Sequence, residues 1–71
     1  MNTTMEARVL EVNNGSLLVC DCNTSQRVLV FTTQACCFCV GDRICIEFNG
    51  VMTRSIPPQI TAICICRVNC W

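Results

Sequence analysis

Short runs in which apolar and polar residues alternate, separated by turn residues, constrain the fold of this chain most. A period of two is typical of a strand with one face in a core and the other in solvent. The pattern is cleanest from Arg43 to Phe48, where Ile44, Ile46 and Phe48 alternate with Arg43, Cys45 and Glu47. We therefore expect a strand here, with its isoleucines and phenylalanine toward the core.

The other strands follow from the same pattern and from the turn residues between them. They are expected at residues 6–12, 16–22, 27–31, 51–54 and about 59–68. Asn13-Asn14-Gly15 and Asn49-Gly50 predict two tight hairpin turns, the second leading into residues 51–54. Pro57-Pro58 ends strand pairing because proline has no N–H to donate.

Two of these strands have specific expected faces. In residues 6–12, Leu10 and Val12 fall on one side and Ala7 and Val9 on the other. In residues 27–31, the β-branched Val28 and Val30 oppose Arg27, Leu29 and Phe31. Phe31 and Phe48 are both expected in the core, because too few aromatic and basic residues accompany them to form a base-stacking surface.

Residues 32–40 break the alternation, so we expect a short helical turn there, with Thr33 as its cap. A helical connector between the third and fourth strands is where the OB-fold places its helix. The 71 residues fit one domain, residues 1–71. The prediction is an all-β, OB-like or SH3-like barrel of about five to six short strands.

Composition separates this chain from disordered and membrane-spanning classes. Its 52% apolar and 14% charged residues differ from the highly charged composition of disordered chains. The longest apolar run, Ala35 to Val40, is far shorter than the roughly 20 residues that a membrane-spanning helix needs. The N-terminus lacks the basic and apolar regions of a signal peptide, so we expect a cytoplasmic protein.

Charge and residue type exclude several functions. Five arginines balance five acidic residues, and neither lysine nor histidine is present. A duplex-binding protein commonly neutralises about six to ten phosphates, so nucleic-acid binding is disfavoured. Without histidine the chain lacks the commonest general base and the usual partner of a serine or cysteine nucleophile. We expect a protein that is not an enzyme.

Nine cysteines are a very high count for a chain of this length, and they have three interpretations. Cys20, Cys22, Cys64 and Cys66 lie in apolar runs and are expected as small, buried, reduced residues. Disulfides would instead stabilise a small domain in an oxidising compartment, which makes an extracellular, disulfide-stapled peptide the second alternative. Cys45 falls on the same side of its strand as Arg43 and Glu47 and is expected to face outward.

A thiolate metal site is the third interpretation and the first alternative function. Soft sulfur ligands favour zinc or Cu(I). Cysteines two apart on a strand are about 6.6 Å apart, too far to chelate one zinc ion at about 2.3 Å. The expected ligands therefore lie mainly off the strands: Cys36 and Cys39 with Cys66 and Cys70. We expect no cofactor, and this alternative function would bring in zinc or Cu(I).

The segment from Gly41 to Ala62 resembles short, uncharacterised OB-like proteins of Gram-positive bacteria, many from gut Clostridia. In those proteins a Gly-Asp strand leads through a glycine turn to a Pro-Gln element and a final strand, as Gly41-Asp42 and Ser55 to Gln59 do here. The resemblance covers about a third of the chain. It implies an OB-like fold and no activity.

A recognition surface is expected at Met52, Arg54, Ile56 and Phe38. Methionine, arginine and aromatic residues are enriched at interfaces, and Pro57-Pro58 would hold the neighbouring residues rigid. Phe38 and Ile56 have a structural alternative, which is to cap the two ends of the barrel. The function expected is a small non-enzymatic binding module for a protein or small ligand, with homodimerisation as a further source of stability.

Overall fold

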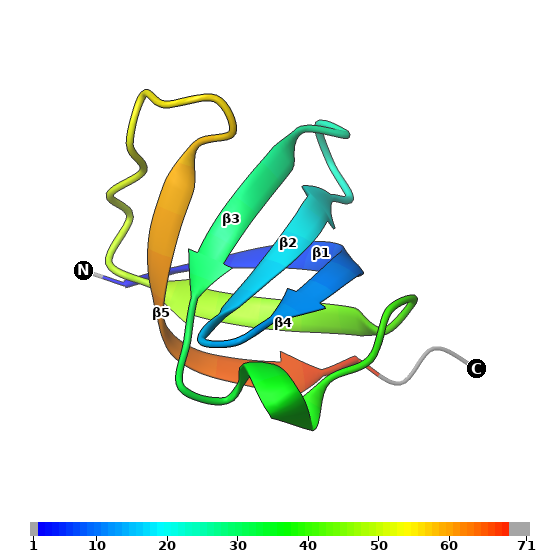
Figure 1. The fold of residues 1–71 in the computed structure, drawn as a ribbon. Coiled ribbons are helices and arrows are strands. Elements are labelled where there is room, and N and C mark those ends of the chain that lie inside the picture. The colour runs from blue at the N-terminus through cyan, green and yellow to red at the C-terminus, as the bar shows by residue number, and fades with distance from the viewer. Residues whose placement is uncertain (1, 69–71) are drawn as a thin grey trace.

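A computed structural model describes residues 2–68, which form a closed five-stranded barrel (Figure 1). Its elements are β1 (Thr3–Asn13), β2 (Ser16–Asp21), β3 (Arg27–Phe31), the 3-10 helix η1 (Ala35–Cys37), β4 (Arg43–Phe48) and β5 (Gln59–Arg67). The order around the barrel is β1-β2-β3-β5-β4. The expected all-β, OB-like barrel with a helical turn between its third and fourth strands is confirmed.

The core fills the inside of the barrel with aliphatic side chains and two aromatic rings. No charged or polar residue among the described ones is buried with them. Among residues 2–68, the structure contains no helix that could span a membrane. The residues of this hydrophobic core are Met5, Ala7, Val9, Leu17, Val19, Val28, Val30, Ala35, Phe38, Ile44, Ile46, Phe48, Ile60 and Ile65.

Strand β1 is long enough to pair with two neighbours, and a bulge divides the two parts. Residues 3–8 pair with β4, residues 7–13 pair with β2, and the register shifts between Val9 and Glu11. The extra residue is Leu10, which is exposed, while Val12 packs against the core. The prediction that Leu10 and Val12 share a face is wrong, because one inserted residue reverses the alternation.

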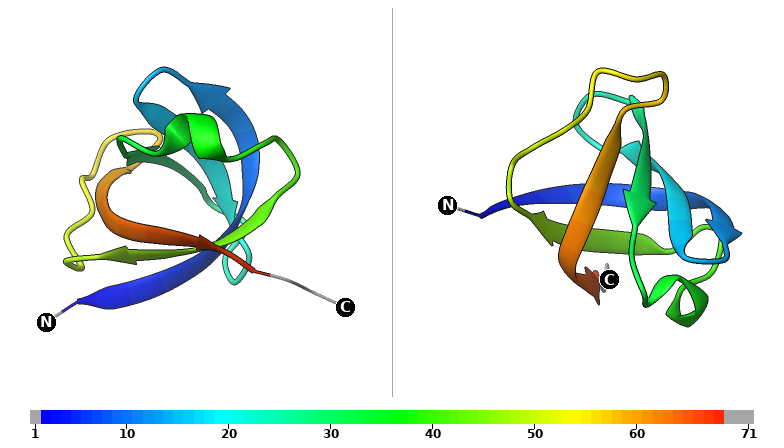
Figure 2. Two further views of the ribbon diagram at one scale, coloured as in Figure 1. Left: turned by 90° about the horizontal axis from the view of Figure 1, so that it is seen from below. Right: turned by 60° about the vertical axis from the view of Figure 1, so that its left-hand side comes forward.

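Strand β5 also divides between two partners (Figure 2). Gln59, Ile60 and Thr61 pair in parallel with β3, and residues 62–67 pair antiparallel with β4. A register shift places Ile63 as an unpaired residue between Ala62 and Cys64. The resulting bend lets one strand close the barrel against both neighbours.

The predicted hairpin at Asn49-Gly50 is wrong, because residues 51–54 form no strand. The Asn49 side chain instead accepts a hydrogen bond from the Val51 N–H at 3.0 Å. Further along, the Thr53 N–H donates to the Gln59 carbonyl at 3.0 Å, and the Gln59 N–H donates to the Thr53 hydroxyl at 2.9 Å. The segment from 49 to 58 is therefore a loop closed at its base, which we call the β4–β5 loop.

Helix η1 lies at the opposite end of the barrel from the β4–β5 loop (Figure 1). The residue at its N-cap position is Gln34 and not the expected Thr33. The Gln34 side chain forms no capping hydrogen bond. Thr32 contributes nearby, since its hydroxyl accepts the Gln34 N–H at 3.1 Å. Ala35 and Phe38 are buried and cover this end of the core.

Candidate functional site

The β4–β5 loop carries three of the four residues predicted for a recognition surface. Met52, Arg54 and Ile56 are all exposed, and Ile56 is fully exposed at 100%. Phe38 is buried next to η1, at the other end of the barrel. Phe38 therefore caps the core, as its structural alternative predicted, whereas Ile56 caps nothing.

The outer side of β2, β3 and β5 carries an apolar face that begins beside this loop. Register pairs Leu18 with Leu29 and aligns Phe31 with Thr61, so these side chains point away from the core. Ile63 follows two residues further along β5 and is also exposed. We define the apolar face as Leu18, Leu29, Phe31 and Ile63.

Phe31 is 41% exposed, so the expectation that it belongs to the core is wrong. Alternation already separated it from Val28 and Val30, and those valines fill the core. Phe31 stands between two hollows on the outer side of β3 and β5. One, of about 170 Å³, also contacts Val51, and the other, of about 390 Å³, also contacts Ile63.

A third hollow connects β2 and β3 with the β4–β5 loop. It has a volume of about 430 Å³ and is lined mainly by Leu18, Arg27, Ile56 and Pro57. Ile56 therefore faces the same space as Leu18, although 38 positions separate them in the sequence (56 − 18). The apolar face and the β4–β5 loop form one continuous candidate site.

The charge of this candidate site is positive and low. The β4–β5 loop contains Arg54 as its one charged residue, and the outward positions of β2, β3 and the first half of β5 add Arg27. No acidic side chain lies among those positions of the described chain. Two cations are too few to neutralise a nucleic-acid backbone, yet enough to favour a partner with a nearby carboxylate.

The cysteines occupy the surface of the molecule, contrary to the expectation that several are buried. All eight within the described residues are exposed or partly exposed, and none is in a disulfide. Cys20, Cys64 and Cys66 lie at outward positions of their strands, and Cys22 lies in the turn after β2, so solvent replaces the expected apolar packing. Cys45 faces outward, as alternation predicted.

Three of these thiols meet on the outer side of β4 and β5. Cys45 lies directly opposite Cys66, and Glu47 lies opposite Cys64. The pKa of Cys64 is raised above the ordinary cysteine value, first by the charge of Cys66 and by a hydrogen bond to it, then by burial, Glu47 and Cys45. Cys64 therefore stays protonated at pH values where an ordinary cysteine begins to ionise.

The predicted zinc ligands do not come together in the described part of the chain. Cys36 and Cys39 are exposed on and after η1, and Cys66 is on the outer side of β5. Cys70 lies outside the described residues. Within residues 2–68, no three cysteine, histidine, aspartate or glutamate side chains are placed to share a metal ion.

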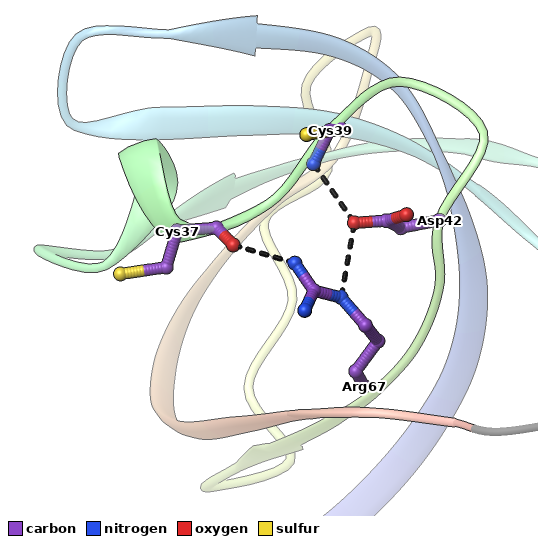
Figure 3. Close-up of polar contacts among 4 residues, drawn as sticks. All are labelled: Cys37, Cys39, Asp42 and Arg67. Atoms are coloured by element: carbon purple, nitrogen blue, oxygen red, sulfur yellow. Dashed lines mark hydrogen bonds and ion pairs between the residues drawn. The ribbon is translucent and has the colours of Figure 1, made fainter.

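Arg67 connects the end of β5 to the segment that contains η1 (Figure 3). Its Nη2 donates to the Cys37 carbonyl at 2.7 Å, and its Nε donates to Asp42 Oδ2 at 3.2 Å. The same Asp42 oxygen accepts the Cys39 N–H at 2.9 Å. This network orders residues 37–42, and nothing in the sequence pattern pointed to it.

Comparisons with protein-family models, with curated proteins and with solved structures find no match to this chain.

Proposed function

We propose that this protein is a non-enzymatic binding module that recognises a short apolar segment of a partner protein, with an acidic residue nearby. The recognition site comprises the apolar face and the β4–β5 loop. The observation that carries the proposal is the position of Phe31, which is exposed between two hollows on one side of the barrel.

Exposed apolar side chains support this assignment. Single exposed apolar residues are ordinary, but a cluster with adjoining hollows is typical of an interaction surface. Phe31 is 41% exposed, Ile63 58% and Val51 65%; Phe31 lines both hollows, Val51 one of them and Ile63 the other. A partner that covers them would remove apolar area from water, at about 25 cal/mol per Å² before the costs of association.

The order of the β4–β5 loop supports the same site. The Thr53 and Ser55 hydroxyls lie 2.6 Å apart, and Ser55 donates to the Pro57 carbonyl at 3.0 Å. Pro58 is buried, and its carbonyl accepts the Leu29 N–H at 2.9 Å. A loop attached in this way presents Ile56 with little conformational entropy left to lose on binding.

The positive charge of the candidate site favours a partner segment that carries a carboxylate over one that is purely apolar. Arg27 and Ile56 line the same hollow, and Arg54 lies on the same loop. An arginine beside an apolar contact can form a bidentate pair with a carboxylate of the partner.

The test is selection of short random peptides displayed on phage against the full-length reduced protein. Because the chain has no lysine, biotin on the N-terminal amine immobilises it in one orientation. We expect enriched peptides that combine apolar residues with aspartate or glutamate. The Phe31→Ser variant should weaken their binding by about tenfold or more, as expected for an interface anchor.

The matched control is Val40→Ser, which removes an exposed apolar side chain outside the apolar face. It should leave peptide affinity unchanged. Absence of enriched peptides, or equal losses in both variants, would contradict the proposal. Two other occupants are outcomes of the same test. Tighter binding of a single-stranded oligonucleotide would favour nucleic acid, and dimerisation abolished by Phe31→Ser would favour a second copy of the chain.

A further inference from the structure

The outer side of β4 and β5 carries a pair of thiols that the proposed binding function does not use. Cys45 and Cys66 are directly opposite each other in the antiparallel register. Ile44 and Ile46 on one strand and Ile65 on the other point into the core, so both cysteines point outward on the same face. Two cysteines that face each other on one surface are candidates for a covalent bond.

The hydrogen-bond pattern determines how far apart these cysteines are. The Val68 N–H donates to the Arg43 carbonyl at 2.8 Å, which makes residues 43 and 68 a hydrogen-bonded pair. Because such pairs recur every two residues, Cys45 and Cys66 form one as well, with a Cα separation of about 5.5 Å. Disulfides most often span about 5.5–6 Å between Cα atoms, so the backbone already permits the bond.

The Cβ atoms require a small adjustment. Directly opposed residues have Cβ atoms about 4.5–5.5 Å apart, nearer the upper value in hydrogen-bonded pairs, whereas a disulfide needs about 3.8 Å. Formation of the disulfide therefore draws the Cβ atoms of the two cysteines together, and the resulting bond is strained. Strained, exposed disulfides are more easily reduced than structural ones.

We propose that Cys45 and Cys66 form a reversible cross-strand disulfide by exchange with a low-molecular-weight disulfide. The Cys66 thiolate attacks one sulfur of the small disulfide and releases one small thiolate, which leaves a mixed disulfide on Cys66. The Cys45 thiolate then attacks the Cys66 sulfur and releases the second small thiolate. Two protein thiols lose two electrons and two protons, and the small disulfide gains both to become two thiols.

The third thiol, Cys64, is a spectator in this exchange. It lies opposite Glu47 and not opposite another cysteine. Cys66, then burial and the Glu47 carboxylate, raise the pKa of the Cys64 thiol, and a protonated thiol is a poor nucleophile. Access favours Cys66 as the thiol that attacks the small disulfide first, since it is exposed and Cys45 is partly covered.

The bond would fasten the part of β5 that pairs with β4. Residues 62–67 pair with β4 alone, whereas residues 59–61 pair with β3. A cross-link from Cys45 to Cys66 joins the two strands near the C-terminal end of that stretch. Oxidation would therefore secure the closing strand of the barrel, and reduction would leave it held by its hydrogen bonds and packing alone.

The experiment equilibrates the reduced full-length protein with graded ratios of reduced and oxidised glutathione, blocks free thiols by alkylation and maps the cross-linked peptides by mass spectrometry. We expect a peptide that joins Cys45 to Cys66 to appear as the ratio becomes oxidising and to disappear when reduced glutathione is restored. Cys64→Ser should leave this linkage unchanged. Cys45→Ser should replace it with glutathione attached to Cys66.

Two outcomes would overturn the proposal. The first is that any other pair, such as Cys20 with Cys22 or Cys64 with Cys66, dominates the linked peptides, or that glutathione attaches without an internal bond. The second is a Cys45 to Cys66 bond that reduced glutathione does not reverse. Because the linkage is mapped in the wild-type protein, the conclusion does not depend on whether a cysteine variant folds.

Discussion

The guanidinium carbon of Arg67 lies 5.6 Å from the centre of the Phe38 ring. Arg67 is the last residue of β5 and lies directly opposite the buried Ile44, so its half-exposed side chain covers Phe38 at this end of the core. The same guanidinium also binds the Cys37 carbonyl and Asp42. One side chain thus holds residues 37–42 against the final strand.

Replacing Arg67 with alanine should lower the free energy of unfolding by about 1–2 kcal/mol. The loss combines a cation–π contact, a charged hydrogen bond to a carbonyl and an ion pair weakened by solvent, since the Arg67 side chain is 52% exposed. Urea denaturation would measure it. Arg54→Ala, on the β4–β5 loop, should change stability by less than about 0.5 kcal/mol, and equal effects of the two variants would contradict this role.

Two phenylalanines should respond differently to truncation. Phe48 is 6% exposed, so Phe48→Ala should destabilise the fold by about 3–5 kcal/mol. Phe31 is 41% exposed, so Phe31→Ala should lower the free energy of unfolding by about 1 kcal/mol, since much of the ring is already in water. Thermal or urea unfolding of both variants would check this. A loss at Phe31 as large as at Phe48 would place Phe31 in the core.

Because of the bulge in β1, substitutions at two apolar residues of this strand should have different effects on stability. Leu10→Gln should leave stability within about 0.5 kcal/mol of the wild type, because Leu10 is at the surface. Val12→Gln should cost about 1–3 kcal/mol, because it places an amide against the core. Similar losses in the two variants would mean that the alternation runs through the strand without a bulge.

The turn between β1 and β2 depends on a glycine at position 15. Gly15 has a φ of 84°, in the left-handed region, and an added Cβ would have no neighbour within 4 Å. Gly15→Ala should therefore lose about 1 kcal/mol through backbone conformation alone. Gly15→Asn should lose less, because asparagine enters this region more readily. Equal losses in unfolding experiments would mean that something other than φ matters here.

The local sequence pattern correctly predicted the strands whose ends are set by their own turn residues. Strands β3 and β4 begin and end where alternation and turn residues placed them. The predicted faces of β1 were wrong from Leu10 onward. A bulge depends on how two strands pair and adds one residue to one of them, so the sequence of one strand does not show it. The hairpin at Asn49-Gly50 failed because the Asn49 side chain bonds its own loop, and the chain closes later, at Thr53 and Gln59.

The candidate site was only partly predictable for a related reason. Alternation separated Leu29 and Phe31 from Val28 and Val30, but which side of a strand becomes covered depends on how the barrel closes. Met52 and Ile56 were predicted on the surface from residue type alone. Ile63 joins them because of a register shift in β5 that no local pattern marks.

The division of β5 between two partners has a consequence for how the molecule is made. Every other strand pair is antiparallel, but β3 and β5 run parallel and are joined by 27 intervening residues, 32–58. A chain leaving the ribosome could pair β1, β2 and β3 as successive hairpins, yet it would expose their apolar inner surfaces until residues 59–67 had emerged. The last strand to be synthesised is the one that seals the interior from water.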